Sequence, residues 1–232
     1  MVFQQFCGVN AVLFNCASIF ESAGFNDAKK VAIIVGAVQF VGTAIACLIV
    51  DRSGRRVLLL SASAVMLVSL VALGVYFEIY IPKHSSAAND ATEVGRGLFH
   101  SISHSVPAEK ISWLSIMSLI VFNLAFALAW GPIPWLMMSE IFPTRARGIA
   151  SGITTLSNWL FAFVVTKTFD TMVHSITTQG TYFLYGGFTF VSFIFVFFAV
   201  PETKGKTLEQ IEALFHSGHL SLYDSLDSDE QE

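Results

Sequence analysis

Charge is scarce in this sequence. Only 13% of the 232 residues are Asp, Glu, Lys or Arg, whereas an average soluble domain carries about 25%. Hydrophobic residues make up 54%, and phenylalanine alone occurs 22 times. One water-soluble core of this size could not bury so many aromatic rings. The composition therefore argues against an ordinary soluble domain and predicts a membrane protein.

Enzyme signatures are missing as well. The sequence has no HExxH, no nucleophile elbow, no phosphate-binding loop and no Rossmann glycine pattern. All six histidines lie outside the apolar segments, and the three cysteines form no CxxC pair. No carboxylate lies deep within an apolar segment, so a proton relay has no evident carrier. We therefore expect no enzyme, no metal site and no cofactor.

What is present is a series of long apolar segments. A membrane helix needs about 20 mainly apolar residues. Six segments meet this requirement: residues 2–20, 31–50, 57–80, 112–138, 148–167 and 181–200. An even number places both chain ends on one side. Because the first segment starts directly at Met1 without flanking charge, we expect the chain to be the second half of a larger protein.

The short connectors predict the orientation. Residues 51–56, 143–148 and 201–207 together carry seven Lys or Arg in compact form. The other side has six, but three of them lie in or beside the long connector around residues 81–110. Because short loops dominate the positive-inside rule, we expect the C-terminus to be cytoplasmic. Five of the 17 acids lie in the last nine residues, so 216–232 is predicted to be an acidic, disordered tail.

Amide side chains recur inside the apolar segments. They include Gln4, Gln5, Asn10, Gln39, Asn123 and Asn158. Unpaired polar groups are costly in hydrocarbon, so such residues usually face a bundle interior or an aqueous cavity. Amides also hold neighbouring helices together. Six amides in four segments favour a shared polar cavity over helix packing alone.

The stretch GPIPW interrupts the fourth segment. Pro132 and Pro134 each remove a backbone donor, and Gly131 adds conformational freedom. Broken helices at membrane depth are typical of transporter binding sites. Trp135 follows the break, and its apolar face with one N–H donor suits the nonpolar face of a sugar ring. An interfacial tryptophan is an equally good interpretation of this residue alone.

Six ordered motifs carry a family resemblance. They are QQFCGVNAV (4–12), DRSGRR (51–56), GPIPW (131–135), SEIFPTRARG (139–148), SNW (157–159) and PETKGKT (201–207). Together they resemble the sugar porter family of the major facilitator superfamily, and more narrowly the facilitative glucose transporters. The resemblance covers residues 1 to about 215. It implies an all-α membrane fold, namely the six-helix C-terminal bundle of a twelve-helix transporter (helices seven to twelve).

The resemblance also implies site residues. It assigns six of them to sugar binding: Gln4, Gln5, Asn10, Gln39, Trp135 and Asn158. Phe14 and Asn15 fall at an outer gate, where Asn15 replaces an aromatic residue, and the break at Gly131, Pro132 and Pro134 belongs to gating. An ion-pair network that closes the cytoplasmic side would comprise Asp51, Arg55, Arg56, Glu140, Arg147 and Glu202. Positive-inside topology alone would explain the arginines but not the three acids.

The implied function is facilitative transport of a hexose by alternating access, without covalent chemistry. The implied partners are the sugar, the lipid bilayer and a missing N-terminal six-helix half, with no nucleic acid, in the plasma membrane or an endosomal or lysosomal membrane. The long connector with WGPIPW and KGKTLEQI looks most like the class III glucose transporters. The insect trehalose transporters are similar, so a disaccharide porter is one alternative. A truncated membrane protein that transports nothing and only binds a partner is another.

Overall fold

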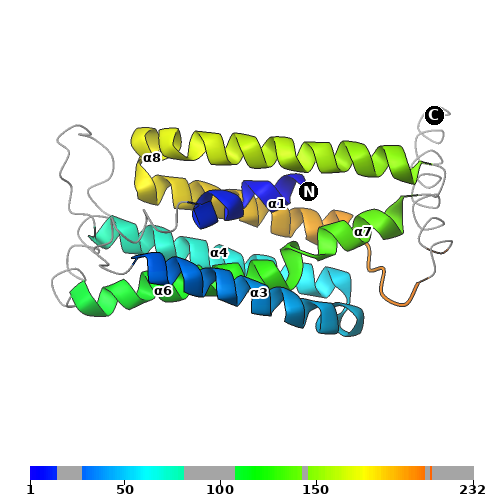
Figure 1. The fold of residues 1–232 in the computed structure, drawn as a ribbon, viewed down its shortest axis with the longest axis horizontal. Helices are drawn as coiled ribbons and strands as arrows, with labels where there is room; N and C mark the ends of the chain where they lie inside the picture. The colour runs from blue at the N-terminus through cyan, green and yellow to red at the C-terminus, as the bar shows by residue number, and fades with distance from the viewer. Residues whose placement is uncertain (15–27, 81–107, 143–145, 207–209, 211–232) are drawn as a thin grey trace, which may run out of the picture.

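The computed structural model describes residues 1–14, 28–80, 108–142, 146–206 and 210, and within these ranges it contains helices and turns but no strand. The helices are α1 (Val2–Phe6), α3 (Ala28–Ser53), α4 (Arg55–Tyr80), α6 (Ala108–Ala125), a π-helix η1 (Phe126–Trp130), α7 (Ile133–Ile141) and α8 (Arg147–Ala199). The long helices lie side by side along the long axis of the molecule (Figure 1).

Four of these stretches are long and apolar enough to cross a membrane: Ile33–Ser53, Arg55–Glu78, Leu114–Ile141 and Arg147–Ala199. The first apolar helix, Val2–Phe14, is shorter and is interrupted at Gly8, and the remainder of the first predicted segment lies outside the described residues. The all-helical membrane fold, predicted from the apolar segments and implied by the family resemblance, is confirmed for the described residues.

The longest helix, α8, folds back on itself. Its 53 residues contain one non-helical position, Thr177, with φ 72° and ψ 163°, where two helices meet. The Thr177 hydroxyl accepts a hydrogen bond from the N–H of Gly180 (3.4 Å), as an N-cap residue does for the helix that follows. Figure 1 shows the two arms running antiparallel. The sequence-based segments 148–167 and 181–200 place a connector between them, whereas both helices continue and meet at a single residue.

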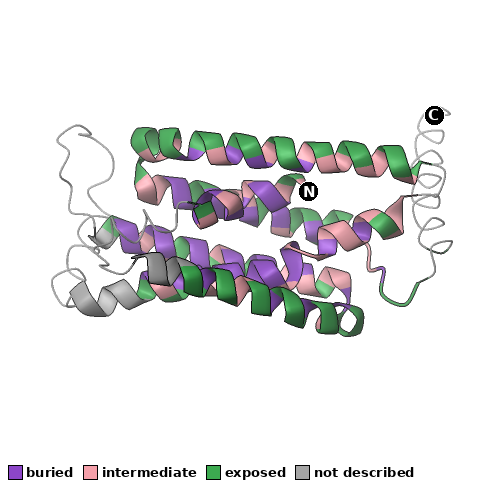
Figure 2. Ribbon diagram, viewed as in Figure 1, coloured by how far each residue is buried: buried purple, intermediate pink, exposed green. Residues whose placement is uncertain are grey.

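The core lies where α4 packs against α6 and α8. The purple, buried side of α4 faces these neighbours, and much of the outer surface of α3 and α8 is exposed (Figure 2). Aromatic rings fill one end of the core, where Phe77 and Tyr182 stack with ring centroids 5.4 Å apart. The outer surfaces carry large apolar side chains such as Phe40 and Phe198, which are 76% and 80% exposed. An apolar outer surface of this kind suits contact with lipid.

Candidate functional site

The fourth apolar stretch is broken in its middle. Helix α6 changes into the π-helix η1, in which the Gly131 N–H bonds to the Phe126 carbonyl five residues earlier (2.8 Å). Gly131 and Pro132 then form a turn, and Pro134 lies in the first turn of α7. In a continuous α-helix, the Trp130 carbonyl would accept from the N–H of residue 134. Because proline has no N–H, that carbonyl needs another donor.

Gln4 of α1 provides that donor. Its Nε2 atom donates to the Trp130 carbonyl (2.8 Å) and to the Gly131 carbonyl (3.2 Å). Two carbonyls can only accept, so the nitrogen of the amide must face the break. The other amide atom, Oε1, is buried and has no hydrogen-bond partner among the described residues. Gln4 thus stabilises the broken helix with one atom and keeps an unused acceptor on the other.

Three further amides form a chain that joins α1 to α8. Asn10 Nδ2 donates to Gln5 Oε1 (2.6 Å), and Gln5 Nε2 donates to Asn158 Oδ1 (2.9 Å). Gln5 uses both amide atoms within this chain. The oxygen of Asn10 and the nitrogen of Asn158 form no hydrogen bond with the other described residues. The chain therefore has an acceptor at one end and a donor at the other.

These amides line one cavity of about 220 Å³. Its walls are Gln4, Gln5, Val9, Asn10, Phe126, Gly131, Trp135, Asn158 and Trp159. Amide groups and aromatic rings therefore meet in the same space, beside the broken helix. A ligand with many hydroxyls and a nonpolar ring face matches both kinds of wall.

The structure brings together five of the six residues that the family resemblance assigns to sugar binding, and the sixth lies elsewhere. Gln39 is half-buried in α3 and does not line the cavity. Phe14 is 72% exposed, and Asn15 lies outside the described residues. Asn123 donates its Nδ2 to the Val35 carbonyl (2.9 Å) and so joins α6 to α3. Asn123 therefore holds two helices together, which is the alternative to a cavity-lining role that the sequence allowed for these amides.

Three lining residues were not identified from the sequence. They are Val9, Phe126 and Trp159. Trp159 follows Asn158 directly, so the SNW motif contained a signal for it. Phe126 opens the π-helix, and a π-helix changes which residues share a face. Helical periodicity alone therefore could not place Phe126 in the wall.

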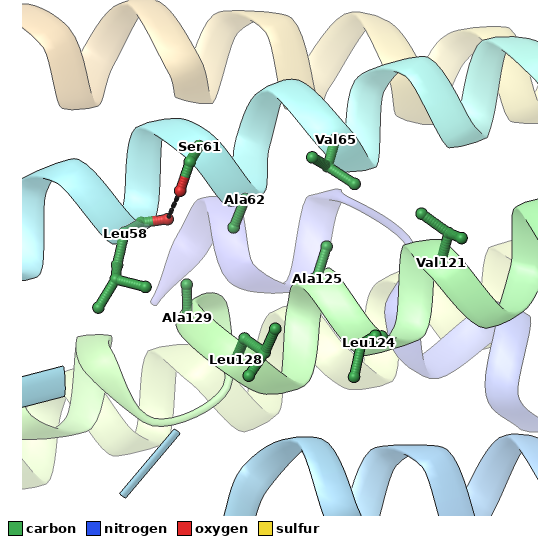
Figure 3. A pocket seen from close by; sticks show the side chains of 9 residues that line it. All are labelled: Leu58, Ser61, Ala62, Val65, Val121, Leu124, Ala125, Leu128 and Ala129. Atoms are coloured by element: carbon green, nitrogen blue, oxygen red, sulfur yellow. Dashed lines mark hydrogen bonds between the residues drawn. The ribbon is translucent and has the colours of Figure 1, made fainter. Parts of the chain in front are cut away.

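A second cavity, of about 180 Å³, lies between α4 and the α6–η1 segment (Figure 3). Its walls are Leu58, Ser61, Ala62, Val65, Val121, Leu124, Ala125, Leu128 and Ala129. Ser61 is the one polar side chain among them, and its hydroxyl proton is donated to the Leu58 carbonyl (3.1 Å). A polyhydroxylated ligand would leave its polar groups unpaired here, so this cavity does not suit a sugar.

Charged side chains gather where α3 meets α4 and α7 ends. Arg55 Nη2 lies 3.0 Å from Glu140 Oε1 and 3.2 Å from Asp51 Oδ1. The other Glu140 oxygen accepts from the Thr203 hydroxyl (2.9 Å). The side chains of Arg55 and Glu140 are only 12% and 18% exposed, whereas that of Asp51 is 76% exposed and solvent screens its pairing. The Arg55–Glu140 pair, which joins α4 to α7, is therefore stronger than the Arg55–Asp51 pair, which joins α4 to α3.

Glu202 has a different role from that of an ion-pair partner. Its carboxylate accepts from the backbone N–H groups of Arg55 (3.0 Å) and Arg56 (3.1 Å), the first two residues of α4. A carboxylate is favoured at this position because the unpaired N–H groups and the helix dipole are positive. The Arg56 guanidinium donates to the Phe197 carbonyl, and Arg147 Nε donates to the Phe142 carbonyl (3.3 Å). Helix capping and backbone contacts thus supplement the ion pairs.

The pKa of Glu202 lies below its ordinary value of 4.5. Partial burial acts to raise this pKa, but hydrogen bonds from the backbone N–H groups of Lys204, Arg55, Arg56 and Thr203 outweigh it. A lowered folded-state pKa means that the ionised carboxylate adds stability above pH 4.5. That contribution is lost as the pH falls through the lower, folded-state value.

We therefore expect Glu202→Gln to reduce the acid sensitivity of the protein. The thermal unfolding midpoint of the unsubstituted protein in detergent should fall as the pH drops below 4.5, and that of the Gln variant should fall less. At pH 7 the variant should already be less stable, because the charged cap is absent. Glu78→Gln is the matched control, because Glu78 is an exposed glutamate at the other end of α4. Equal acid profiles for the Glu202 variant and the unsubstituted protein would contradict the capping role.

Gly54 makes this cap possible. It has φ +88°, and an added Cβ would lie 2.8 Å from Glu202 Oε2. We expect Gly54→Ala to lower the free energy of unfolding by about 1–3 kcal/mol, from backbone strain and displacement of the carboxylate. Gly205→Ala is the control, because Gly205 has φ +71° but open space around it, and only the smaller conformational cost applies. If chemical denaturation gave both variants the same stability, the contact with Glu202 would have no energetic importance.

Long apolar helices, a helix broken by proline and a cavity lined with amides and aromatic rings are together typical of a membrane transport protein. The sequence profile described as "Sugar (and other) transporter" matches residues 1–215. The chain belongs to this sugar transporter family, as the motifs predicted.

Known relatives agree with this assignment. The chain is 43% identical over 218 residues to facilitated glucose transporter member 8 of Mus musculus, covering 93% of the chain and 44% of the relative. It is 40% identical over 213 residues to the facilitated trehalose transporter Tret1 of Drosophila pseudoobscura pseudoobscura, covering 91% and 22%. Among solved structures, the proton:xylose symporter XylE bound to 6-bromo-6-deoxy-D-glucose superimposes with a TM-score of 0.72 at 31% identity, covering 92% of the chain and 40% of XylE. The chain thus spans less than half the length of these relatives.

Proposed function

We propose that this chain is the C-terminal six-helix half of a facilitative hexose transporter. A glucose-like sugar would bind in the cavity of about 220 Å³ and cross the membrane down its gradient by alternating access. The family membership and the two facilitated transporters among the relatives support this function. The same relatives support a transport role without covalent chemistry.

The unused hydrogen-bonding atoms of the cavity are the observation that carries the proposal. Gln4 Oε1 is a buried acceptor without a partner in the part of the chain that the structure describes. The amide chain adds the acceptor of Asn10 and the donor of Asn158. Every sugar hydroxyl can donate and accept, so one ring can satisfy atoms of both kinds. Trp135 would stack on the nonpolar face of the ring, as tryptophan does in other pockets.

A second half would complete the site. The lining residues come from the first apolar segment, the η1–α7 break and the first arm of α8, so they form one wall of a cavity. We expect an N-terminal six-helix half to supply the opposite wall. The cluster of Arg55, Glu140 and Glu202 would face the cytoplasm with the C-terminus and close the inner side. The pair of Arg55 with the exposed Asp51 beside this cluster is weak, which suits a contact that must open in every transport cycle.

Sugar counterflow in proteoliposomes tests the proposal. The chain would be reconstituted with and without a matching N-terminal half, and labelled glucose, fructose and trehalose would be offered in turn. We expect saturable glucose flux only when both halves are present. If both halves insert correctly and no sugar moves, the transport function is wrong for this chain, and a role as a non-transporting membrane partner would take its place.

A disaccharide porter is the second candidate. The trehalose transporters among the relatives favour it, because their identity to this chain is only slightly lower than that of the glucose transporter. Trehalose competition against labelled glucose separates the two candidates. Strong competition, together with flux of labelled trehalose itself, would favour the disaccharide. We expect neither strong competition by trehalose nor trehalose flux.

We further propose that the protein lies in the plasma membrane or in an endosomal or lysosomal membrane.

A further inference from the structure

Trp130, the last residue of the π-helix, is held at two points. Its backbone carbonyl accepts from Gln4 Nε2 (2.8 Å), and its indole Nε1 donates to the hydroxyl of Ser63 in α4 (2.8 Å). Ser63 donates its own proton to the Leu59 carbonyl (2.7 Å). Trp130 is 5% exposed and Ser63 is 0% exposed. A continuous series of buried hydrogen bonds therefore runs from α4 through Trp130 to Gln4.

The direction of these bonds is fixed by chemistry. A serine hydroxyl has one proton, and Ser63 uses it on Leu59, so towards Trp130 it can act only as an acceptor. The indole N–H is only a donor, so it needs such an acceptor when it is buried. Ser63 satisfies this need at one defined position on α4.

Trp130 depends on this anchor because the backbone around it is irregular. The residue lies between a π-helix and the turn at Gly131, and Pro134 removes the donor that would hold its carbonyl in an α-helix. The side-chain bond to Ser63 therefore contributes strongly to the position of the Trp130 carbonyl. Because Gln4 Nε2 donates to that carbonyl, the position of the carbonyl determines how the Gln4 amide is oriented. The orientation of the amide in turn determines where Gln4 Oε1 lies.

We propose that Ser63 is a positioning residue for the sugar site. It does not line the cavity of about 220 Å³, and it acts through Trp130 to place the unused acceptor of Gln4. The inference rests on the proposed transport function and adds a determinant of sugar affinity in a helix outside the site. Preorganised groups bind better because less order must be imposed when the ligand arrives.

A plain packing role makes a different prediction. If the Ser63–Trp130 bond only holds α4 against η1, its loss should reduce the amount of folded protein and hence the maximal rate. The KM of the folded fraction would then stay the same. A positioning role instead raises KM, because the acceptor is still present but misplaced.

The test uses the two-half proteoliposomes and whichever of the three sugars the unsubstituted protein carries. Ser63→Ala and Trp130→Phe remove the same hydrogen bond from opposite ends. We expect each to raise KM about fivefold, within the range known for residues remote from a ligand. The maximal rate per inserted molecule should change less than about twofold by the same reasoning.

Ser69→Ala is the matched control. Ser69 is a buried serine of the same helix, and its hydroxyl bonds to the Val65 carbonyl of α4 (2.8 Å). We expect this variant to keep the KM of the unsubstituted protein. If Ser63→Ala fails to insert, Trp130→Phe alone decides the question.

Unchanged KM in the Ser63 and Trp130 variants that fold would overturn the positioning role and leave the transport function intact. The same would follow from an equal rise in KM for Ser69→Ala. Absence of flux from the unsubstituted protein would instead overturn the transport function, and with it this inference.

Discussion

Replacing Gln4 by Leu should lower the transport efficiency, kcat/KM, by about 10- to 100-fold. The substitution removes the acceptor Oε1 from the cavity, and it also lowers the stability of the broken helix because the Trp130 and Gly131 carbonyls lose their donor. Each buried polar group left unpaired costs about 1–3 kcal/mol, and 1.4 kcal/mol corresponds to a factor of ten. Because Leu and Gln are similar in volume, packing changes contribute little. Initial rates of counterflow over a range of sugar concentrations give the measurement.

Thr155→Ala is the control for this prediction. Thr155 is a half-buried residue of α8, only three positions before Asn158, and it does not line the cavity. Its loss should leave kcat/KM within about twofold, as is usual away from special sites. Comparable losses for the Thr155 and Gln4 variants would mean that the cavity is not the sugar site. Protein insertion should be quantified for both variants, since the broken helix depends on Gln4.

Gly8→Ala should destabilise the protein by several kcal/mol. Gly8 has φ +82°, and a Cβ atom built on it would lie 2.5 Å from Cδ2 of the Tyr185 ring. Overpacking costs about 1–3 kcal/mol, and a further penalty arises because an alanine does not readily adopt positive φ. Tyr185 is 2% exposed in the core, so its ring can move only if its neighbours move as well. Thermal unfolding in detergent should show a much lower midpoint or no folded protein.

Gly36→Ala provides the comparison for Gly8. Gly36 lies within α3 with nothing within 4 Å of an added Cβ, and its φ is not positive. Alanine is favoured over glycine in a helix interior by about 1 kcal/mol, so this variant should be unchanged or slightly more stable. A Gly8 variant as stable as the Gly36 variant would show that the first apolar helix can be rebuilt without the break at Gly8. The amides on either side of Gly8 would then need no glycine to reach the cavity.

The polar wall of the site could be predicted because each type of group has a strong local signature. Amides in an apolar segment, prolines in the middle of another and a tryptophan directly after them are visible one residue at a time. These signals, together with the family resemblance, pointed to Gln4, Gln5, Asn10, Trp135 and Asn158, which line one cavity. The all-helical membrane fold followed from composition and from the length of the apolar segments for the same reason.

Other features depend on contacts between distant segments, and the sequence contains no local signal for them. The Gln4 amide uses its nitrogen on a carbonyl 126 residues away, so only its acceptor stays unused. Glu202 looked like an ion-pair partner because of its charge, yet it caps the backbone of α4. Gln39 shares the chemistry of the other amides but lies on a helix that does not border the cavity. The reversal at Thr177 replaces a whole expected connector with one residue of unusual φ.

The bond between Gln4 and the Trp130 carbonyl has a consequence for how the protein is made. Residues of the first apolar helix are synthesised well before the segment 108–141 enters the bilayer, and the Trp130 carbonyl of that segment has no helical donor because residue 134 is proline. Lipid offers no donor for that carbonyl. The carbonyl is therefore satisfied only once the first helix and the broken helix have come together. The donor, Gln4, is thus synthesised before the segment that contains the Trp130 carbonyl.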